Sequence, residues 1–146
     1  MTLALLLAPA ASAAPGDVTG VWLGHDRDGH VEIKPCGKFL CGYIISILDK
    51  TIPANPRDIY NEKTELRTRP ICDLQVLGEL KNQGDSWGDG WVYDPRTGKS
   101  YSAEIKLNNP NTLELRGYIG IKFMGETRIW TRASKNIPRC VRARPQ

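Results

Sequence analysis

Apolar and polar residues alternate along this chain in short runs, each closed by turn-forming residues. In the run 101–107, for example, Tyr101, Ala103 and Ile105 fall on one face and polar residues fall on the other. A period of two is typical of a half-buried β-strand. Such runs predict strands at residues 19–23, 31–34, 39–47, 74–80, 87–94, 99–107, 112–118 and 126–132, and they predict no helix.

Short turns join most of the predicted strands. Between 87–94 and 99–107, Pro95 fixes one backbone dihedral and Gly98 can take the left-handed conformation that a hairpin loop needs. Strands at hairpin distance favour an antiparallel meander, and closing the meander removes its two exposed edges. The sequence therefore predicts an all-β fold, an antiparallel up-and-down barrel of about eight strands.

The connection 49–73 is much longer than the others and is rich in Pro, Asn and charged residues. Loops of this length are uncommon in compact domains and are usually functional or disordered. We expect it to lie over one mouth of the barrel. Arg67 and Arg69, beside the rigid Pro70, would there meet an anionic group of a ligand. The alternative is a solvated loop of mixed charge.

The N-terminal segment indicates export. Residues 2–14 carry no charge and include Ala11-Ser12-Ala13, a small-x-small pattern that a signal peptidase accepts, although no basic residue follows Met1. The stretch is too short to span a bilayer as a helix, so we expect removal rather than anchoring. We predict a signal peptide at 1–13, a single barrel domain at 14–134 and a basic tail at 135–146.

The net charge of +4 is unevenly placed, because every charged residue from Arg132 onward is basic. A solvated C-terminal tail is the expected structure, and peripheral contact of this tail with anionic lipid is the alternative. The aromatic residues are not interleaved with a basic stripe, so the sequence does not indicate a nucleic-acid partner. Nothing in it indicates an oligomeric state.

The chain contains four cysteines, an even number that suggests disulfides in an exported protein. Cys36 and Cys41 flank a predicted hairpin turn, so their side chains can meet across the strands. Cys72 and Cys140 then pair by elimination, although four cysteines allow three connectivities.

Metal and catalytic motifs are weak. Residues 25–30, with the sequence HDRDGH, have the composition of a metal loop but lack the spacing and the bidentate Glu of a calcium loop. No Ser lies in a Gly-x-Ser-x-Gly motif, and no glycine loop is followed by Lys-Ser or Lys-Thr. We therefore predict no metal and no cofactor, and an enzyme is the least favoured class.

Six motifs stand in order along the chain: GVW at 20–22, PCGKFLCG at 35–42, LRTRPI at 66–71, YDPRTGKSYS at 93–102, RGYIG at 116–120 and WTR at 130–132. Together they resemble a family of exported bacterial proteins known as domain of unknown function 2147, over about residues 18–132. The resemblance implies a lipocalin-like barrel in the periplasm or outside a bacterial cell. It implies no particular biochemical activity.

The lipocalin comparison also implies how the barrel closes. In that group, a Gly-x-Trp on the first strand packs at the closed end, and an Arg from the last strand lies over the indole. Gly20 and Trp22 match the first element. Arg128 and Arg132 flank Trp130 on the last strand, and Arg132 is taken as the match to the second element. Such a cation–π pair stabilises by roughly 1–2 kcal/mol. The alternative is an ordinary core tryptophan.

These observations predict an exported barrel that binds a small apolar or amphipathic ligand or an envelope component. Alternation alone suggests the residues that line the interior: Ile33, Tyr43, Tyr93, Tyr101, Ile105 and Leu115. Roughly 130 residues is small for such a barrel, so a filled interior is the competing prediction. The protein would then act through its outer surface, in envelope interactions or stress protection.

Overall fold

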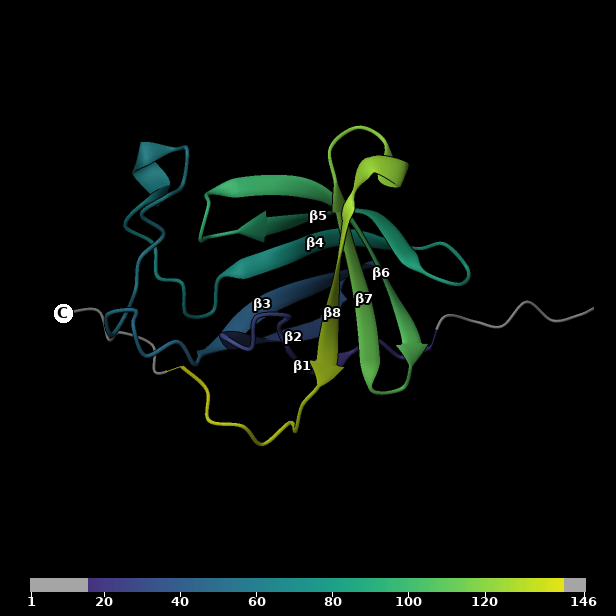
Figure 1. The fold of residues 1–146 in the computed structure, drawn as a ribbon, viewed down its shortest axis with the longest axis horizontal. Coiled ribbons are helices and arrows are strands. Elements are labelled where there is room, and N and C mark those ends of the chain that lie inside the picture. The colour runs from purple at the N-terminus through teal and green to yellow at the C-terminus, as the bar shows by residue number, and fades with distance from the viewer. Residues whose placement is uncertain (1–15, 141–146) are drawn as a thin grey trace, which may run out of the picture.

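The computed structural model describes residues 16–140. Eight strands form one closed barrel in which each strand pairs antiparallel with the next and β8 pairs with β1 (Figure 1). The strands are β1 (Gly20–Leu23), β2 (Gly29–Cys36), β3 (Phe39–Ile47), β4 (Gln75–Asn82), β5 (Trp87–Asp94), β6 (Lys99–Asn109), β7 (Thr112–Tyr118) and β8 (Glu126–Arg132). Two short 3₁₀ turns lie in connections, η1 (Thr64–Leu66) and η2 (Lys122–Met124). The predicted up-and-down barrel is confirmed.

The two ends of the barrel carry different connections. Because consecutive strands run in opposite directions, the β1–β2, β3–β4, β5–β6 and β7–β8 connections all lie at one end, here called the open end. The long β3–β4 connection lies beside the β5–β6 turn, and the β7–β8 connection projects with η2 from another part of the rim (Figure 1). The opposite end, here called the closed end, carries the residues before β1 and the remaining turns.

Large apolar side chains fill the closed end. The largest of those that are almost fully buried are Trp22, Ile33, Leu77, Leu80, Ile105 and Leu113. They come from β1, β2, β4, β6 and β7, so the inward faces of strands far apart in sequence meet in one core. Interiors of this kind are close-packed, so this half of the barrel leaves no room for a ligand.

Arg132 covers the closed end. Its guanidinium carbon lies 4.3 Å from the centroid of the Trp22 ring, and its nitrogens donate hydrogen bonds to the carbonyls of Asp17, Thr19 and Pro110. Gly20 makes this close approach possible, because a Cβ there would lie 3.0 Å from Arg132 Nη1. Arg132 therefore ties the residues before β1 to the β6–β7 turn.

The two disulfides join Cys36 to Cys41 and Cys72 to Cys140. The first crosses the β2–β3 turn, and the second joins the end of the long β3–β4 connection to the C-terminal segment. These are the two expected pairs, the first from its place across the hairpin turn and the second by elimination.

The C-terminal segment is fastened to the outside of the barrel as far as Cys140. After β8, the Ala133 amide bonds to the Val21 carbonyl, Arg139 forms two hydrogen bonds to the Glu32 carboxylate, and the Cys140 amide bonds to the Ile45 carbonyl. An ion pair and a disulfide thus hold residues 135–140 against the barrel, although most of these residues are exposed to solvent as expected. The predicted signal peptide, Arg142 and Arg144 lie outside the described residues. Within residues 16–140, no helix is long and apolar enough to cross a membrane.

Candidate functional site

The open half of the barrel contains a cavity of about 1450 Å³. Its mouth is formed by residues of the four open-end connections, and its walls are inward-facing residues of β2 to β8. Drug-sized ligands occupy pockets of about 300–1,000 Å³. The space is therefore large enough for a small molecule and is continuous with solvent at the mouth.

Small inward residues help to keep this half open. Gly117 on β7 carries no side chain, and a Cβ there would be in ordinary contact, at 3.7 Å, with Tyr101 and Val92. Ser46 on β3 and Gly29 on β2 are further small residues of the wall. The corresponding inward positions at the closed end carry Leu and Ile, which explains why one half is filled and the other is not.

The part of the cavity wall that faces the closed end, here called the lower wall, is apolar. It is formed by Val31, Ile44, Val76, Leu115 and Trp130, from five different strands. Trp130, expected with the closing residues, instead lies on the cavity side of the core that Leu113 and Leu115 also form. An apolar chain that entered from the mouth would rest on this surface.

One polar pair interrupts the apolar wall. His30 Nδ1 lies 2.6 Å from the hydroxyl oxygen of Ser46, its cross-strand neighbour. A β-bulge lies between His30 and Val31, and it lets these two consecutive residues of β2 both line the cavity. Burial lowers the pKa of His30 and so favours the neutral imidazole. The sequence places His30 in a turn, and no local signal reveals its partner 16 residues away.

The long β3–β4 connection is anchored by a buried carboxylate, that of Asp58. Asp58 is fully buried and accepts hydrogen bonds from the Tyr93 hydroxyl at 2.5 Å, from Arg69 Nε at 2.7 Å and from Asn61 Nδ2 at 2.9 Å. Burial disfavours the charged carboxylate, but these hydrogen bonds outweigh it and lower the pKa of Asp58. Burial and the Asp58 charge together raise the pKa of Tyr93.

A second contact fixes the same connection to the β5–β6 turn. Gly98 has a φ of 72°, and a Cβ there would overlap the Tyr60 carbonyl oxygen at 1.7 Å. Any other residue would therefore force the two segments apart. Together with the Asp58–Tyr93 bond, this contact fixes the long connection at the mouth, although most of its residues are exposed to solvent.

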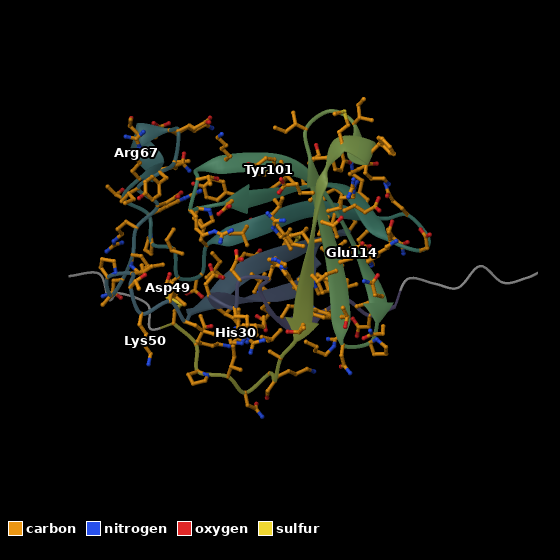
Figure 2. The ribbon with its side chains drawn as sticks, in the orientation of Figure 1. His30, Asp49, Lys50, Arg67, Tyr101 and Glu114 are labelled. Atoms are coloured by element: carbon orange, nitrogen blue, oxygen red, sulfur yellow. A yellow bond between two sulfur atoms is a disulfide. The ribbon has the colours of Figure 1, made fainter. Side chains whose placement is uncertain are left out.

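Arg67 and Arg69, expected at the mouth as ligand contacts, do not line the cavity. Arg69 is bound to Asp58, and its guanidinium lies 5.4 Å from the centroid of the Tyr93 ring. Arg67 donates to the Asn61 carbonyl at 2.7 Å, and it lies at the outer tip of the connection, away from the barrel (Figure 2). Both side chains support the loop. The sequence places them correctly beside Pro70, but it does not identify their partners.

The expected lining residues divide into three groups. Tyr93, Tyr101 and Leu115 line the cavity; the label of Tyr101 marks its place on the barrel wall in Figure 2. Ile33 and Ile105 point inward but lie in the filled closed end. Tyr43 lies on the outer face, where the Lys34 ammonium is 4.8 Å from the centroid of its ring. The inward position next to it is Gly42, which packs against Leu77 and Val31.

Charged side chains at the mouth are mostly paired. Arg96 of the β5–β6 turn contacts Asp26 at 2.5 Å, Asp94 at 3.2 Å and Asp28 at 3.6 Å. Hydrogen bonds from Asp94 and Asp26 raise the pKa of Arg96 further above its ordinary value. This cluster ties the β5–β6 turn to the β1–β2 turn and has more negative than positive groups.

The β7–β8 connection forms an apolar lip at the mouth. Its exposed large apolar residues are Ile119, Ile121, Phe123 and Met124, with exposed fractions from 66% to 89%. Arg116 on β7 holds the lip in place by donating to the carbonyls of Lys122 and Phe123. Exposed apolar surface that is concentrated in one place usually marks an interaction site or a ligand entrance.

A smaller cavity of about 450 Å³ lies between the long connection and the C-terminal segment, and the Cys72–Cys140 disulfide lines it. Within residues 16–140, no group of three or more His, Cys, Asp or Glu side chains is placed to hold a metal ion.

Comparisons with known proteins agree with this geometry. No curated protein matches the chain. The barrel is similar to protein HP1028 from the human pathogen Helicobacter pylori, which is described as belonging to the lipocalin family. The two share 25% sequence identity and a TM-score of 0.73, over 81% of this chain and 84% of that chain. The sequence pattern of the DUF2147 family, described as an uncharacterized protein conserved in bacteria, matches residues 20–132. The chain therefore belongs to the DUF2147 family and has a lipocalin-like fold.

Proposed function

We propose that this protein is an exported carrier or receptor that binds a small apolar or amphipathic molecule in the open half of its barrel. The observation that carries the proposal is the cavity of about 1450 Å³ above a filled closed end. A barrel with this division has a rigid base and an accessible space, which is the arrangement that a small-ligand site requires.

The lining supports an apolar chain with a polar group. Burying apolar surface contributes about 25 cal/mol per Å², so the lower wall would supply most of the affinity. Tyr93 offers its ring, since its hydroxyl is bound to Asp58. Tyr101 adds a second aromatic side chain with a polar tip, which suits an amphipathic ligand. We propose binding rather than catalysis.

The two disulfides suggest an oxidising compartment outside the cytoplasm. We propose that this compartment is the periplasm or the exterior of a bacterial cell. Contact of the basic tail with anionic lipid would rest on Lys135, Arg142 and Arg144, since Arg139 is paired with Glu32.

Extraction of the natively expressed protein tests this function. Protein purified from its host without detergent, extracted with organic solvent and analysed by mass spectrometry should release one apolar compound in stoichiometric amount. Gly117→Leu should reduce that amount, because the new side chain would project into the cavity next to Tyr101. Ser102→Leu is the matched control, because Ser102 is an exposed residue of the neighbouring strand β6. Equal loading of both variants would contradict a ligand site in the barrel.

A second candidate is an envelope interaction protein that works through its outer surface. The observation that favours it is the apolar lip, in which Phe123 is 89% exposed. A photo-crosslinking residue at position 123 should then capture a specific envelope protein in living cells, and one at the exposed Lys106 should not. An empty barrel after extraction, combined with such a crosslink, would favour this candidate over ligand binding.

A further inference from the structure

Three arginines line the cavity, namely Arg57, Arg96 and Arg128. They differ in the groups that bind each guanidinium. Arg96 is surrounded by Asp26, Asp28 and Asp94, so the net charge around it is negative. Arg57 comes from the long connection and donates to the Thr68 carbonyl of that same connection. The charge of Arg96 is therefore already neutralised. Arg57 forms no ion pair that is seen within residues 16–140, but it is an exposed residue of the long connection and does not belong to the strands that carry the apolar lower wall.

Arg128 is placed differently. It lies on β8, two residues before Trp130 and directly opposite Leu115 of β7. All three side chains line the cavity, so the guanidinium stands above the apolar lower wall rather than in a loop. An anionic group bound there would leave its apolar chain in contact with Leu115 and Trp130.

The carboxylate that holds Arg128 is an exposed one. Glu126, two residues earlier on the same strand, accepts a hydrogen bond from Arg128 Nη2 at 2.9 Å, and its side chain is 78% exposed. Exposed ion pairs of this kind contribute little free energy, so a ligand can replace Glu126 at small cost. Arg128 also lies within electrostatic reach of Asp26, but that carboxylate is bound by Arg96.

We propose that Arg128 is the anion-binding residue of the cavity and that the ligand is an amphiphile with one anionic group, such as a long-chain carboxylate. This inference rests on the proposed ligand-binding function and specifies its ligand class. A guanidinium offers several donors in a planar fork that matches a carboxylate. In the proposed complex, the carboxylate binds the guanidinium in place of Glu126, and the apolar chain covers the lower wall.

The test compares two fluorescent probes that share one chain, parinaric acid and its methyl ester. Wild-type protein should bind the acid about tenfold more tightly than the ester, as expected for hydrogen bonds to a charged group. Arg128→Met keeps an apolar stem and removes the charge, so it should abolish this preference while leaving the affinity for the ester unchanged. Arg67→Met is the matched control and should retain the preference, since Arg67 does not line the cavity.

For a second variant we expect the opposite effect, and this variant remains informative even if Arg128→Met does not fold. Glu126→Gln removes the competing carboxylate, so it should tighten binding of the acid severalfold and leave the ester unchanged. Circular dichroism and thermal unfolding would establish that each variant retains the barrel.

The outcomes separate the two proposals. Equal binding of acid and ester by the wild type, or an equal loss of both with Arg128→Met, would overturn the role of Arg128 and leave the ligand site in place. Weaker acid binding by Glu126→Gln would also overturn it. Binding of neither probe by the wild-type protein, freed of any co-purified compound, would overturn both the role of Arg128 and the proposed function.

Discussion

The hydroxyl of Tyr93 on β5 donates a 2.5 Å hydrogen bond to the buried carboxylate of Asp58, 35 residues away in the long β3–β4 connection. This contact fixes the longest connection of the barrel against the wall of the cavity, because Tyr93 itself lines that cavity. Two of the motifs by which the sequence resembles its family meet here, since Arg69 from LRTRPI and Tyr93 from YDPRTGKSYS share Asp58 as partner. The Asp58 carboxylate is thus one of the groups that hold the mouth together, beside the Gly98–Tyr60 contact.

Tyr93→Phe should destabilise the protein by about 1–3 kcal/mol, because it leaves a buried carboxylate with one hydrogen bond fewer. Urea denaturation at neutral pH would measure the change in the free energy of unfolding. Tyr60→Phe is the control, since Tyr60 is 59% exposed. Equal stability of the two variants would show that the bond to Asp58 contributes nothing.

Acid should weaken the same contact. The pKa of Asp58 is lower in the folded than in the unfolded protein, so its contribution to stability is present above the unfolded value, about 3.9. That contribution is lost as the pH falls through the lower folded pKa. The free energy of unfolding of Asp58→Asn should therefore fall less steeply than that of the wild type below about pH 4. Urea denaturation series at several pH values would show this, and parallel curves would refute it.

The two disulfides should differ in their effect on stability. The loop closed by Cys72–Cys140 spans 68 residues and that closed by Cys36–Cys41 spans 5. Chain entropy then gives about 4 kcal/mol for the longer loop and about 2 kcal/mol for the shorter. Denaturation of the Cys72→Ser/Cys140→Ser and Cys36→Ser/Cys41→Ser variants would compare them. Non-reducing peptide mapping of wild-type protein would verify the pairing, and free thiols at either pair would contradict it.

Arg132→Met should destabilise the closed end by about 1–3 kcal/mol, because it removes the cation–π contact with Trp22 and three hydrogen bonds to backbone carbonyls. Arg128→Met, on the same strand, removes the weak exposed pair with Glu126 and should have a much smaller effect. Thermal unfolding of both variants measures the difference. A larger loss with Arg128→Met would argue against Arg132 as the closing residue.

Export should remove the N-terminal segment. Cleavage after Ala13 would leave a mature protein that begins at Ala14, because Pro15 after the scissile bond would block cleavage one residue later. N-terminal sequencing of protein recovered from the envelope of its native host measures this directly. Recovery of soluble envelope protein that retains Leu5-Leu6-Leu7 would contradict the prediction.

The sequence by itself was sufficient for the strand pattern and for the barrel, because both depend on local information. Alternation reports which residues of a strand share a face, and Pro95 and Gly98 report where a hairpin turns. It also indicated both cysteine pairs, one from the hairpin and one by elimination. The local signals for β2 were incomplete, since β2 begins at Gly29, where its pairing with Ile47 extends it beyond the alternating run.

Two properties were decided by the tertiary structure alone: how far along the barrel axis each inward residue lies, and which group each charged side chain binds. Ile105 and Tyr101 lie on the same face of β6, yet Ile105 is in the filled closed end and Tyr101 lines the cavity. Periodicity carries no information about height along the barrel, because it repeats identically from one end of a strand to the other. Arg67, Arg69 and Arg128 are likewise equivalent as charges in the sequence. Whether each one is bound by Asp58, by a backbone carbonyl or by an exposed Glu126 depends on the positions of residues that meet only when the barrel closes.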